Sequence, residues 1–130
     1  MNPSPKILVV EDNALMRETL RRMLEIEGYI VIEAEDGPSG IALARTEKPD
    51  LVMLDIMMPY MTGTEVISYM QSDPLLKAIP IIVLSAINQP KQVLKVLQLK
   101  VRDYLLKPID HITLRQRVQA ALNGNSEIYS

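Results

Sequence analysis

The chain has 130 residues, of which 48% are apolar and 23% are charged, a composition typical of one globular domain rather than of a disordered segment. It contains no cysteine, which excludes disulfides, iron–sulfur clusters and thiol nucleophiles. Fourteen basic and sixteen acidic residues argue against a surface that binds nucleic acid or membrane through bulk positive charge, and no apolar run approaches the roughly 18 residues of a membrane span. We expect a single cytoplasmic domain over residues 1–130, with a core at about 6–122 and with 123–130 as a tail or the start of a linker.

Five short apolar runs predict strands. In chain order they lie at 7–10, 30–32, 51–54, 79–84 and 103–106. The first, third and fourth are nearly continuous and rich in β-branched residues, which is typical of strands buried on both faces. Segments with helical spacing follow these runs, and crossovers between parallel strands are right-handed. The order therefore predicts an α/β fold with a doubly wound, five-stranded parallel sheet.

Single residues indicate where the helices between these strands begin and end. Gly28 suits the end of the first helix. Pro38 and Pro90 suit the first turns of the second and fourth helices. Thr62 opens a capping box for the third helix, and Asp110 suits the N-cap of the last.

Polar residues follow four of the five predicted strands. Glu11 and Asp12 come after the first, Asp55 after the third, Ser85 after the fourth and Lys107 after the fifth. In an open parallel sheet, ligands bind beyond the carboxyl ends of the strands, so we expect these side chains to converge. Three carboxylates this close would destabilise the fold through their mutual repulsion unless cations lie among them. A lysine offsets part of this repulsion, and Mg²⁺ can offset the rest. The arrangement predicts phosphoryl transfer to an aspartate.

The same residues resemble the receiver domain of the two-component response-regulator family, from about residue 6 to residue 122. The match is carried in order by Glu11-Asp12, by the segment 54–59 around Asp55, by Gly63, by Ser85-Ala86, and by Tyr104 with Lys107-Pro108. The resemblance implies the flavodoxin-like (βα)5 receiver fold. It also implies a protein that is phosphorylated as a signal and is not an enzyme with turnover.

The resemblance further implies a role for each acidic residue. Asp55 is expected to accept a phosphoryl group from the phosphohistidine of a partner kinase. Asp12, Asp55 and the backbone carbonyl of Met57 are expected to bind Mg²⁺ directly, and Glu11 to act on the ion through a water molecule.

The remaining roles implied by the resemblance concern the switch. Lys107 and Ser85 are expected to contact the phosphoryl oxygens, and Tyr104 to turn inward as Ser85 moves. The Lys107–Pro108 peptide is expected to be cis, which the small trans preference before proline permits.

The chain departs from the family pattern at two places. Lys100-Val101 stand where the family usually has Gly-Ala, and because a left-handed lysine costs about 1–2 kcal/mol, we expect the turn to differ locally. In the family, two positions flank the path of the water that hydrolyses the phosphoaspartate; here they are Met57 and Ile87, and neither side chain can orient a water by hydrogen bonding. We therefore expect slow autodephosphorylation.

The partners implied are a sensor histidine kinase or phosphotransfer protein and a downstream target protein or output domain, with no direct role for nucleic acid or membrane. A phosphorylation-dependent dimer is compatible with the resemblance. However, the face of the fourth helix and fifth strand is expected to be unusually basic, which puts the standard dimer in doubt; its residues are Lys91, Lys95, Lys100 and Arg102. The alternative reading is a receiver-like module that binds proteins constitutively without phosphorylation.

Overall fold

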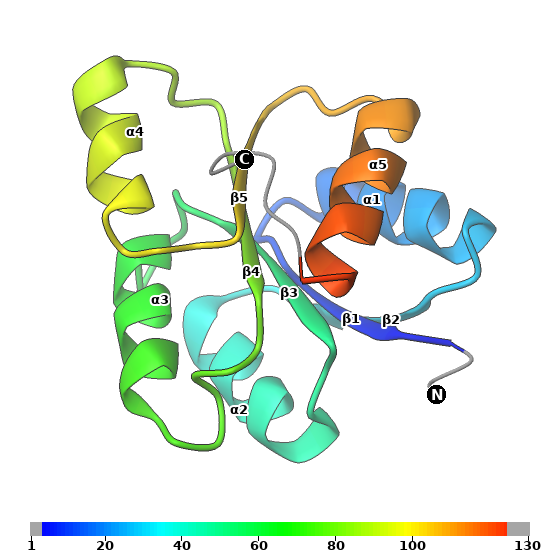
Figure 1. Cartoon of the computed structure of the whole chain (residues 1–130), viewed down its shortest axis with the longest axis horizontal. Helices are drawn as coiled ribbons and strands as arrows, with labels where there is room; N and C mark the ends of the chain where they lie inside the picture. The colour runs from blue at the N-terminus through cyan, green and yellow to red at the C-terminus, as the bar shows by residue number, and fades with distance from the viewer. Residues whose placement is uncertain (1–3, 125–130) are drawn as a thin grey trace.

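The computed structural model describes residues 4–124, so most of the predicted tail lies outside the described residues. Five parallel strands form one sheet in the order β2-β1-β3-β4-β5 (Figure 1). The predicted α/β fold with a doubly wound parallel sheet is thereby confirmed. The strands are β1 (Lys6–Val10), β2 (Ile30–Ala34), β3 (Leu51–Asp55), β4 (Ile81–Ser85) and β5 (Asp103–Leu106).

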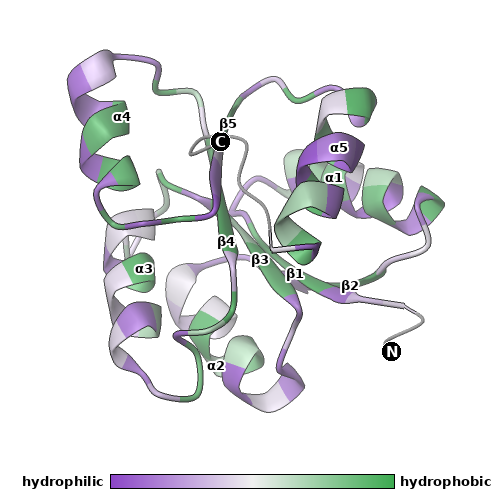
Figure 2. Cartoon of the chain, in the orientation of Figure 1, coloured by the Kyte–Doolittle hydropathy of each residue, from purple (hydrophilic) through white to green (hydrophobic). Residues whose placement is uncertain are grey.

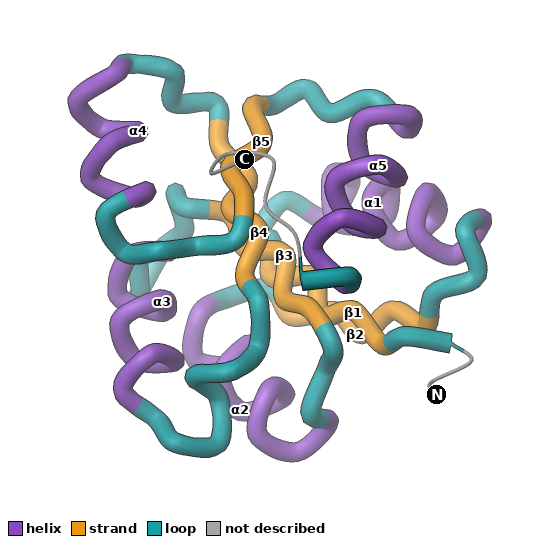
Figure 3. The backbone as a smooth tube through the Cα atoms, viewed as in Figure 1, coloured by secondary structure: helices purple, strands orange, loops and turns teal. Residues whose placement is uncertain are grey.

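Five helices alternate with these strands and cover both faces of the sheet. Helices α1 and α5 lie on one face and α2, α3 and α4 on the other (Figures 1 and 3). Their bounds are α1 (Ala14–Ile26), α2 (Gly37–Glu47), α3 (Gly63–Ser72), α4 (Pro90–Leu97) and α5 (His111–Leu122). Within residues 4–124, no helix has the length and apolar character that crossing a bilayer requires.

Alternate residues of the strands pack in two separate hydrophobic cores, one on each face of the sheet, because successive side chains point to opposite faces. On β3, Met53 packs in the core under α1 and α5, whereas Val52 and Leu54 pack in the core under α2, α3 and α4. All three are fully buried. The continuous apolar runs of the central strands are thus explained by burial on both faces.

The boundary signals in the sequence are confirmed. The Asp110 carboxylate accepts the N–H of Thr113 at 2.8 Å and so caps α5. Thr62 forms the complete capping box of α3, and Pro38 and Pro90 lie in the first turns of α2 and α4. Gly28 adopts φ +91° just after α1, where a left-handed residue commonly ends a helix.

The turn before β5 corrects one expectation. Lys100 adopts φ +60°, in the left-handed region, and its N–H donates to the Leu97 carbonyl at 3.0 Å. The expectation of a locally different turn was wrong: the left-handed turn is retained with a lysine in it. The packing of Val101, which is 2% exposed, and the bond from the Arg102 N–H to the Ile81 carbonyl at 2.8 Å hold the chain in this path despite the backbone penalty.

Candidate functional site

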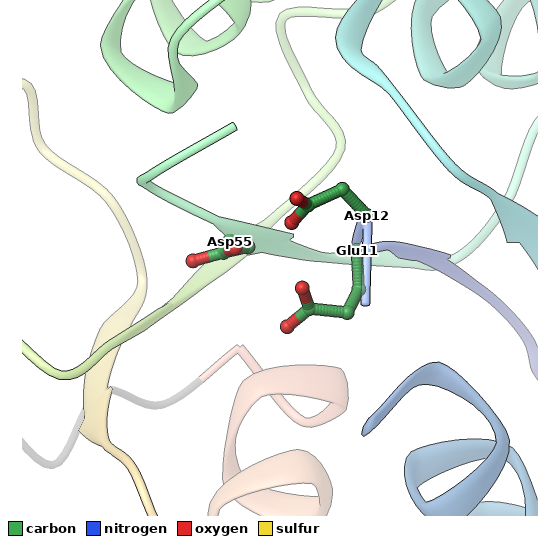
Figure 4. A group of neighbouring side chains, drawn as sticks. All are labelled: Glu11, Asp12 and Asp55. Atoms are coloured by element: carbon green, nitrogen blue, oxygen red, sulfur yellow. The ribbon is translucent and has the colours of Figure 1, made fainter. Parts of the chain in front are cut away.

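Three carboxylates meet at the carboxyl ends of the central strands. β1 and β3 are hydrogen-bonded neighbours with Val10 opposite Leu54, so the next residues along, Glu11 and Asp55, lie side by side. Glu11, Asp12 and Asp55 each offer an oxygen within 4.8 Å of the others, and Figure 4 shows the three carboxylates gathered in one place. Glu11 is fully buried, Asp55 is 4% exposed, and Asp12 is open to solvent. The three carboxylates of the predicted group are therefore brought together.

Lys107 supplies a cation to this group. Its Nζ lies 2.7 Å from the Glu11 Oε1 and 3.4 Å from the Asp55 Oδ1. The Lys107 N–H donates to the Ser85 carbonyl at 2.8 Å, which fixes the end of β5 against the end of β4. The Lys107–Pro108 peptide is cis, as predicted.

The charges of this group shift its pKa values. Burial, followed by the charge of Glu11, raises the pKa of Asp55 to about 6, although Lys107 and the Met57 N–H act in the opposite direction. Burial alone would lower the pKa of Lys107, but its hydrogen bond to Glu11 and the charges of Asp55 and Glu11 outweigh burial and raise it. Lys107 thus stays charged, whereas the ionised form of Asp55 is disfavoured by its surroundings.

Glu11 is held in place from several sides. Besides Lys107, its carboxylate accepts the N–H of Asn13 at 3.1 Å, and its backbone carbonyl accepts the Arg17 guanidinium at 2.7 Å. Asn13 in turn caps α1 by accepting the N–H of Met16. The two bonds to its carboxylate keep the Glu11 side chain in one orientation, which points into the site rather than into solvent.

Gly63 allows α3 to begin directly against the strand that carries Asp55. A Cβ atom at this position would lie 2.6 Å from the Ile56 Cα and 2.8 Å from the Asp55 carbonyl oxygen. The Gly63 N–H donates to the Ile56 carbonyl at 2.9 Å. Only glycine permits this approach of backbone to backbone.

Ser85 and Tyr104 both bond to the backbone of Ile87. The Ser85 Oγ accepts the Ile87 N–H, and the Tyr104 hydroxyl donates to the Ile87 carbonyl, each at 2.9 Å. The two residues that the resemblance assigned to the switch are therefore connected through one residue of the β4–α4 loop. Sequence reasoning did not identify this connection, since a backbone group has no signature in a sequence.

Sequence reasoning also missed the partner of Arg117. Its guanidinium donates to both oxygens of Asp103 at 2.6 and 2.7 Å, and Asp103 is only 2% exposed at the start of β5. This ion pair, of which only the carboxylate is buried, ties α5 to β5, the strand that leads to Lys107.

The family profile of the response regulator receiver domain matches residues 7–119. The chain belongs to this family. Protein PilH of Pseudomonas aeruginosa is 39% identical to this receiver domain over 119 residues, which cover 92% of this chain and 98% of that protein. This receiver domain spans a smaller share, from 26% to 54%, of the length of seven other curated relatives.

Solved structures share the fold of this receiver domain. The signal receiver domain of a signal transduction histidine kinase from Syntrophus aciditrophicus has a TM-score of 0.86 at 30% identity, covering 93% of this chain and 92% of that chain. The chemotaxis response regulator CheY4 of Vibrio cholerae has a TM-score of 0.84 at 28% identity, covering 89% of this chain and 97% of that chain. The predicted flavodoxin-like receiver fold is therefore confirmed.

Proposed function

We propose that this receiver domain accepts a phosphoryl group on Asp55, with Mg²⁺ in the acidic pocket, from a histidine kinase or phosphotransfer protein in the cytoplasm. The observation that carries the proposal is the buried Asp55 carboxylate, which lies with Glu11 and Asp12 on one side and the Lys107 ammonium 3.4 Å away. A nucleophilic carboxylate beside a fixed cation is what phosphoryl transfer requires.

In the proposed transfer, a carboxylate oxygen of Asp55 attacks phosphorus. The new oxygen–phosphorus bond forms as the phosphorus–nitrogen bond of the donor's phosphohistidine breaks, and the bonding electron pair returns to the imidazole nitrogen. Lys107 is already at the carboxylate, so its ammonium can neutralise the phosphoryl oxygens without a large movement. Ser85, fully buried at the end of β4, can donate its hydroxyl to one of them.

The donor set at the pocket fits Mg²⁺. The oxygens of Glu11, Asp12 and Asp55 lie within 4.8 Å of one another, and carboxylate oxygens with water are the ligands this ion prefers. We assign direct binding to Asp12, Asp55 and the Met57 backbone carbonyl, and a water-mediated role to Glu11, whose carboxylate is occupied by Lys107 and Asn13. When bound, Mg²⁺ supplies positive charge to the phosphoryl oxygens during transfer.

The proposed output is a change in the surface formed by α4, β5 and α5. A phosphoryl group would accept a hydrogen bond from the Ser85 hydroxyl, and movement of that side chain toward the phosphoryl group would break the bond that its Oγ accepts from the Ile87 N–H. Because Tyr104 bonds to the same residue and also lines the surface beside α4, the change reaches the face available to a target protein or output domain. The domain is thus a switch with a single self-modification, reversed by slow autodephosphorylation, rather than a turnover enzyme.

The test is intact-mass analysis after incubation with acetyl phosphate, with Mg²⁺ or with a chelator, on the native chain and on Asp55→Asn. The expected result is the gain of one phosphoryl mass that requires both Mg²⁺ and Asp55. Asp50→Asn is the matched control, since Asp50 lies at the opposite ends of the strands beside Lys6, and it should gain the same mass as the native chain.

No gain of mass from acetyl phosphate or from a phosphorylated histidine kinase, in a chain that still binds Mg²⁺, would contradict the proposal. That result would favour the constitutive binding module.

A further inference from the structure

A small cavity of about 100 Å³ lies at the amino ends of β4 and β5, at the edge of the sheet opposite the acidic pocket. One wall is formed by the last turn of α3 and by residues 76–81, which lead into β4, and the other by residues 100–102, which lead into β5. Its volume equals that of about three water molecules. The cavity can therefore take one small ion or the end of a larger molecule.

Positive charge surrounds this cavity. Its lining contains the basic residues Lys77, Lys100 and Arg102 and no acidic residue. Lys77 and Lys100 are exposed, and within residues 4–124 neither ammonium has an ion pair or a hydrogen bond. The Arg102 guanidinium donates to the Ala121 carbonyl at 2.7 Å, which keeps its charge at this edge of the sheet.

The sequence around the cavity has the same sign of charge. From residue 74 to residue 102 it contains five basic residues and no acidic residue, whereas residues 1–73 contain thirteen acidic and six basic residues. An anion that approaches this edge of the sheet would therefore meet a positive field, although the whole chain carries a net charge of −2.

Hydrogen bonds hold the two walls of the cavity together. The Gln71 amide donates to the Leu99 carbonyl and so joins α3 to the turn before β5. The Arg102 N–H donates to the Ile81 carbonyl at 2.8 Å and joins the same turn to β4. In Figure 2 the segment between α4 and β5 carries both hydrophobic and hydrophilic colours. The basic residues are thus attached to a backbone that is fixed before any ligand binds, which lowers the entropy cost of binding.

The backbone of Lys100 points to a use for its charge. This residue adopts φ +60°, a conformation that glycine reaches freely and a lysine only against strain. Val101, the next residue, is 2% exposed and packs in the core, whereas the lysine itself is exposed. Strained residues of this kind are found at binding and catalytic sites, so a charge kept at this cost favours a ligand beside it.

We infer that this cavity binds a phosphate group, either as the free ion or as the terminal group of a small molecule. A phosphate offers oxygens in several directions, which ammonium and guanidinium donors on different walls can bond at the same time. The competing role for Lys77 and Lys100 is to neutralise the carboxyl ends of α3 and α4, and the variants below separate the two. Because the cavity lies at the other edge of the sheet from Asp55, the inference goes beyond the proposed phosphorylation and does not depend on it.

The first measurement is a titration of the isotope-labelled native chain with inorganic phosphate, followed by the NMR signals of the backbone amides in the presence of a chelator. The chelator removes divalent ions, so the acidic pocket repels the anion. We expect saturable shifts at residues 76–79 and 100–102, with half-saturation at about 1–10 mM. Sulfate should compete with phosphate, whereas chloride at equal ionic strength should not.

A second titration, with AMP, identifies the source of the phosphate group. Tighter binding of AMP than of inorganic phosphate would show that the cavity takes the group as part of a larger molecule, and tighter binding of inorganic phosphate would show that it takes the free ion. Either order supports the inference only if the same amides shift.

Variants locate the binding. Lys77→Gln and Lys100→Gly should each weaken phosphate binding about three- to tenfold. Lys100→Gly also removes the strained lysine backbone, so a loss of binding in this variant does not come from a less stable chain. The matched control is Lys91→Gln/Lys95→Gln, which removes two charges from α4 outside the cavity lining and should leave phosphate binding unchanged.

No saturable shift up to about 50 mM phosphate, equal shifts with chloride, or affinity that is unchanged in Lys77→Gln and Lys100→Gly would overturn the inference. Unchanged binding together with lower thermal stability in Lys77→Gln would overturn it in favour of the role at the helix ends. Asp55→Asn should give the same shifts as the native chain, and their loss would place the anion at the acidic pocket instead. Failure of acetyl phosphate to add mass would count against the phosphoacceptor proposal alone.

Discussion

The Tyr104 hydroxyl donates a hydrogen bond of 2.9 Å to the carbonyl oxygen of Ile87, which lies two residues beyond the end of β4. The N–H of the same residue is bonded to Ser85. The loop between β4 and α4 is therefore held at one residue by two side chains, one from the end of β4 and one from β5.

Removing either side-chain partner should have a distinct local effect. In Ser85→Ala the Ile87 N–H loses its acceptor, and its amide exchange should accelerate, whereas in Tyr104→Phe that N–H keeps its bond and its protection. Tyr104→Phe should lower the free energy of unfolding by about 0.5–1.5 kcal/mol, the net contribution of one hydrogen bond. Hydrogen exchange by NMR and urea unfolding test both statements. Equal acceleration at Ile87 in the two variants would contradict the separate roles.

Asp55→Asn should stabilise the unphosphorylated chain at pH 7 in the presence of a chelator. Burial and Glu11 raise the pKa of Asp55 to about 6 in the folded chain. The carboxyl therefore ionises more easily in the unfolded chain, and the native chain loses stability as the pH rises from about 4 to about 6. Two pKa units correspond to about 3 kcal/mol, and because water at the open rim screens part of this, we expect a gain of about 1–2 kcal/mol.

The free energies of unfolding of Asp55→Asn and of the native chain should become nearly equal near pH 4, where the Asp55 carboxyl is largely protonated in the folded chain and partly protonated in the unfolded chain. Asp73→Asn is a control of opposite sign. The Leu75 N–H and then Arg45 lower the pKa of Asp73, so its charge contributes stability above its unfolded pKa and Asp73→Asn should be less stable at pH 7. Thermal unfolding from pH 4 to pH 8 measures both. A native chain whose stability rises between pH 4 and 6 relative to Asp55→Asn would refute the assignment.

Lys100→Gly should raise the free energy of unfolding by about 0.5–1 kcal/mol. Lys100 adopts φ +60°, which costs a residue with a Cβ about 1–2 kcal/mol, and the greater freedom of glycine in the unfolded chain offsets part of the gain. Lys100→Ala removes the same charge but keeps the Cβ and should show no gain. Lys95→Gly places a glycine inside α4 and should lower the free energy of unfolding by about 1 kcal/mol, because glycine is a poor helix former. Urea unfolding of the three variants separates backbone strain from charge.

The phosphoryl group on Asp55 should last minutes rather than seconds in the isolated chain. Met57, 66% exposed beside the acceptor, and Ile87 have no side-chain group that can orient an attacking water. Met57→Gln introduces such a group and should shorten the half-life several-fold, whereas Met57→Leu should leave it unchanged. The decay of phosphorylated chain followed by intact mass provides the test. A half-life of seconds in the native chain would show that water reaches the phosphoryl group without help from either position.

The sequence was sufficient where the physical signal is local or topological. Val52 to Leu54 are apolar without alternation because both faces of β3 are covered, and Asp12 and Asp55 meet because parallel neighbours end at the same edge of the sheet. The bond from Tyr104 to Ile87 could not be foreseen, since its acceptor is a backbone carbonyl. The left-handed conformation of Lys100 could not be foreseen either. Its backbone energy penalty is local, but the packing that outweighs this penalty involves residues distant in the sequence.

Glu11 and Lys107 are 96 residues apart in the sequence and 2.7 Å apart in space. The buried glutamate therefore receives a countercharge that the chain itself carries, and receives it only when the last strand has joined the sheet. Folding of the chain and the proposed binding of Mg²⁺ are therefore expected to be separate events. The native chain should fold in the presence of a chelator, with Glu11 already paired to Lys107.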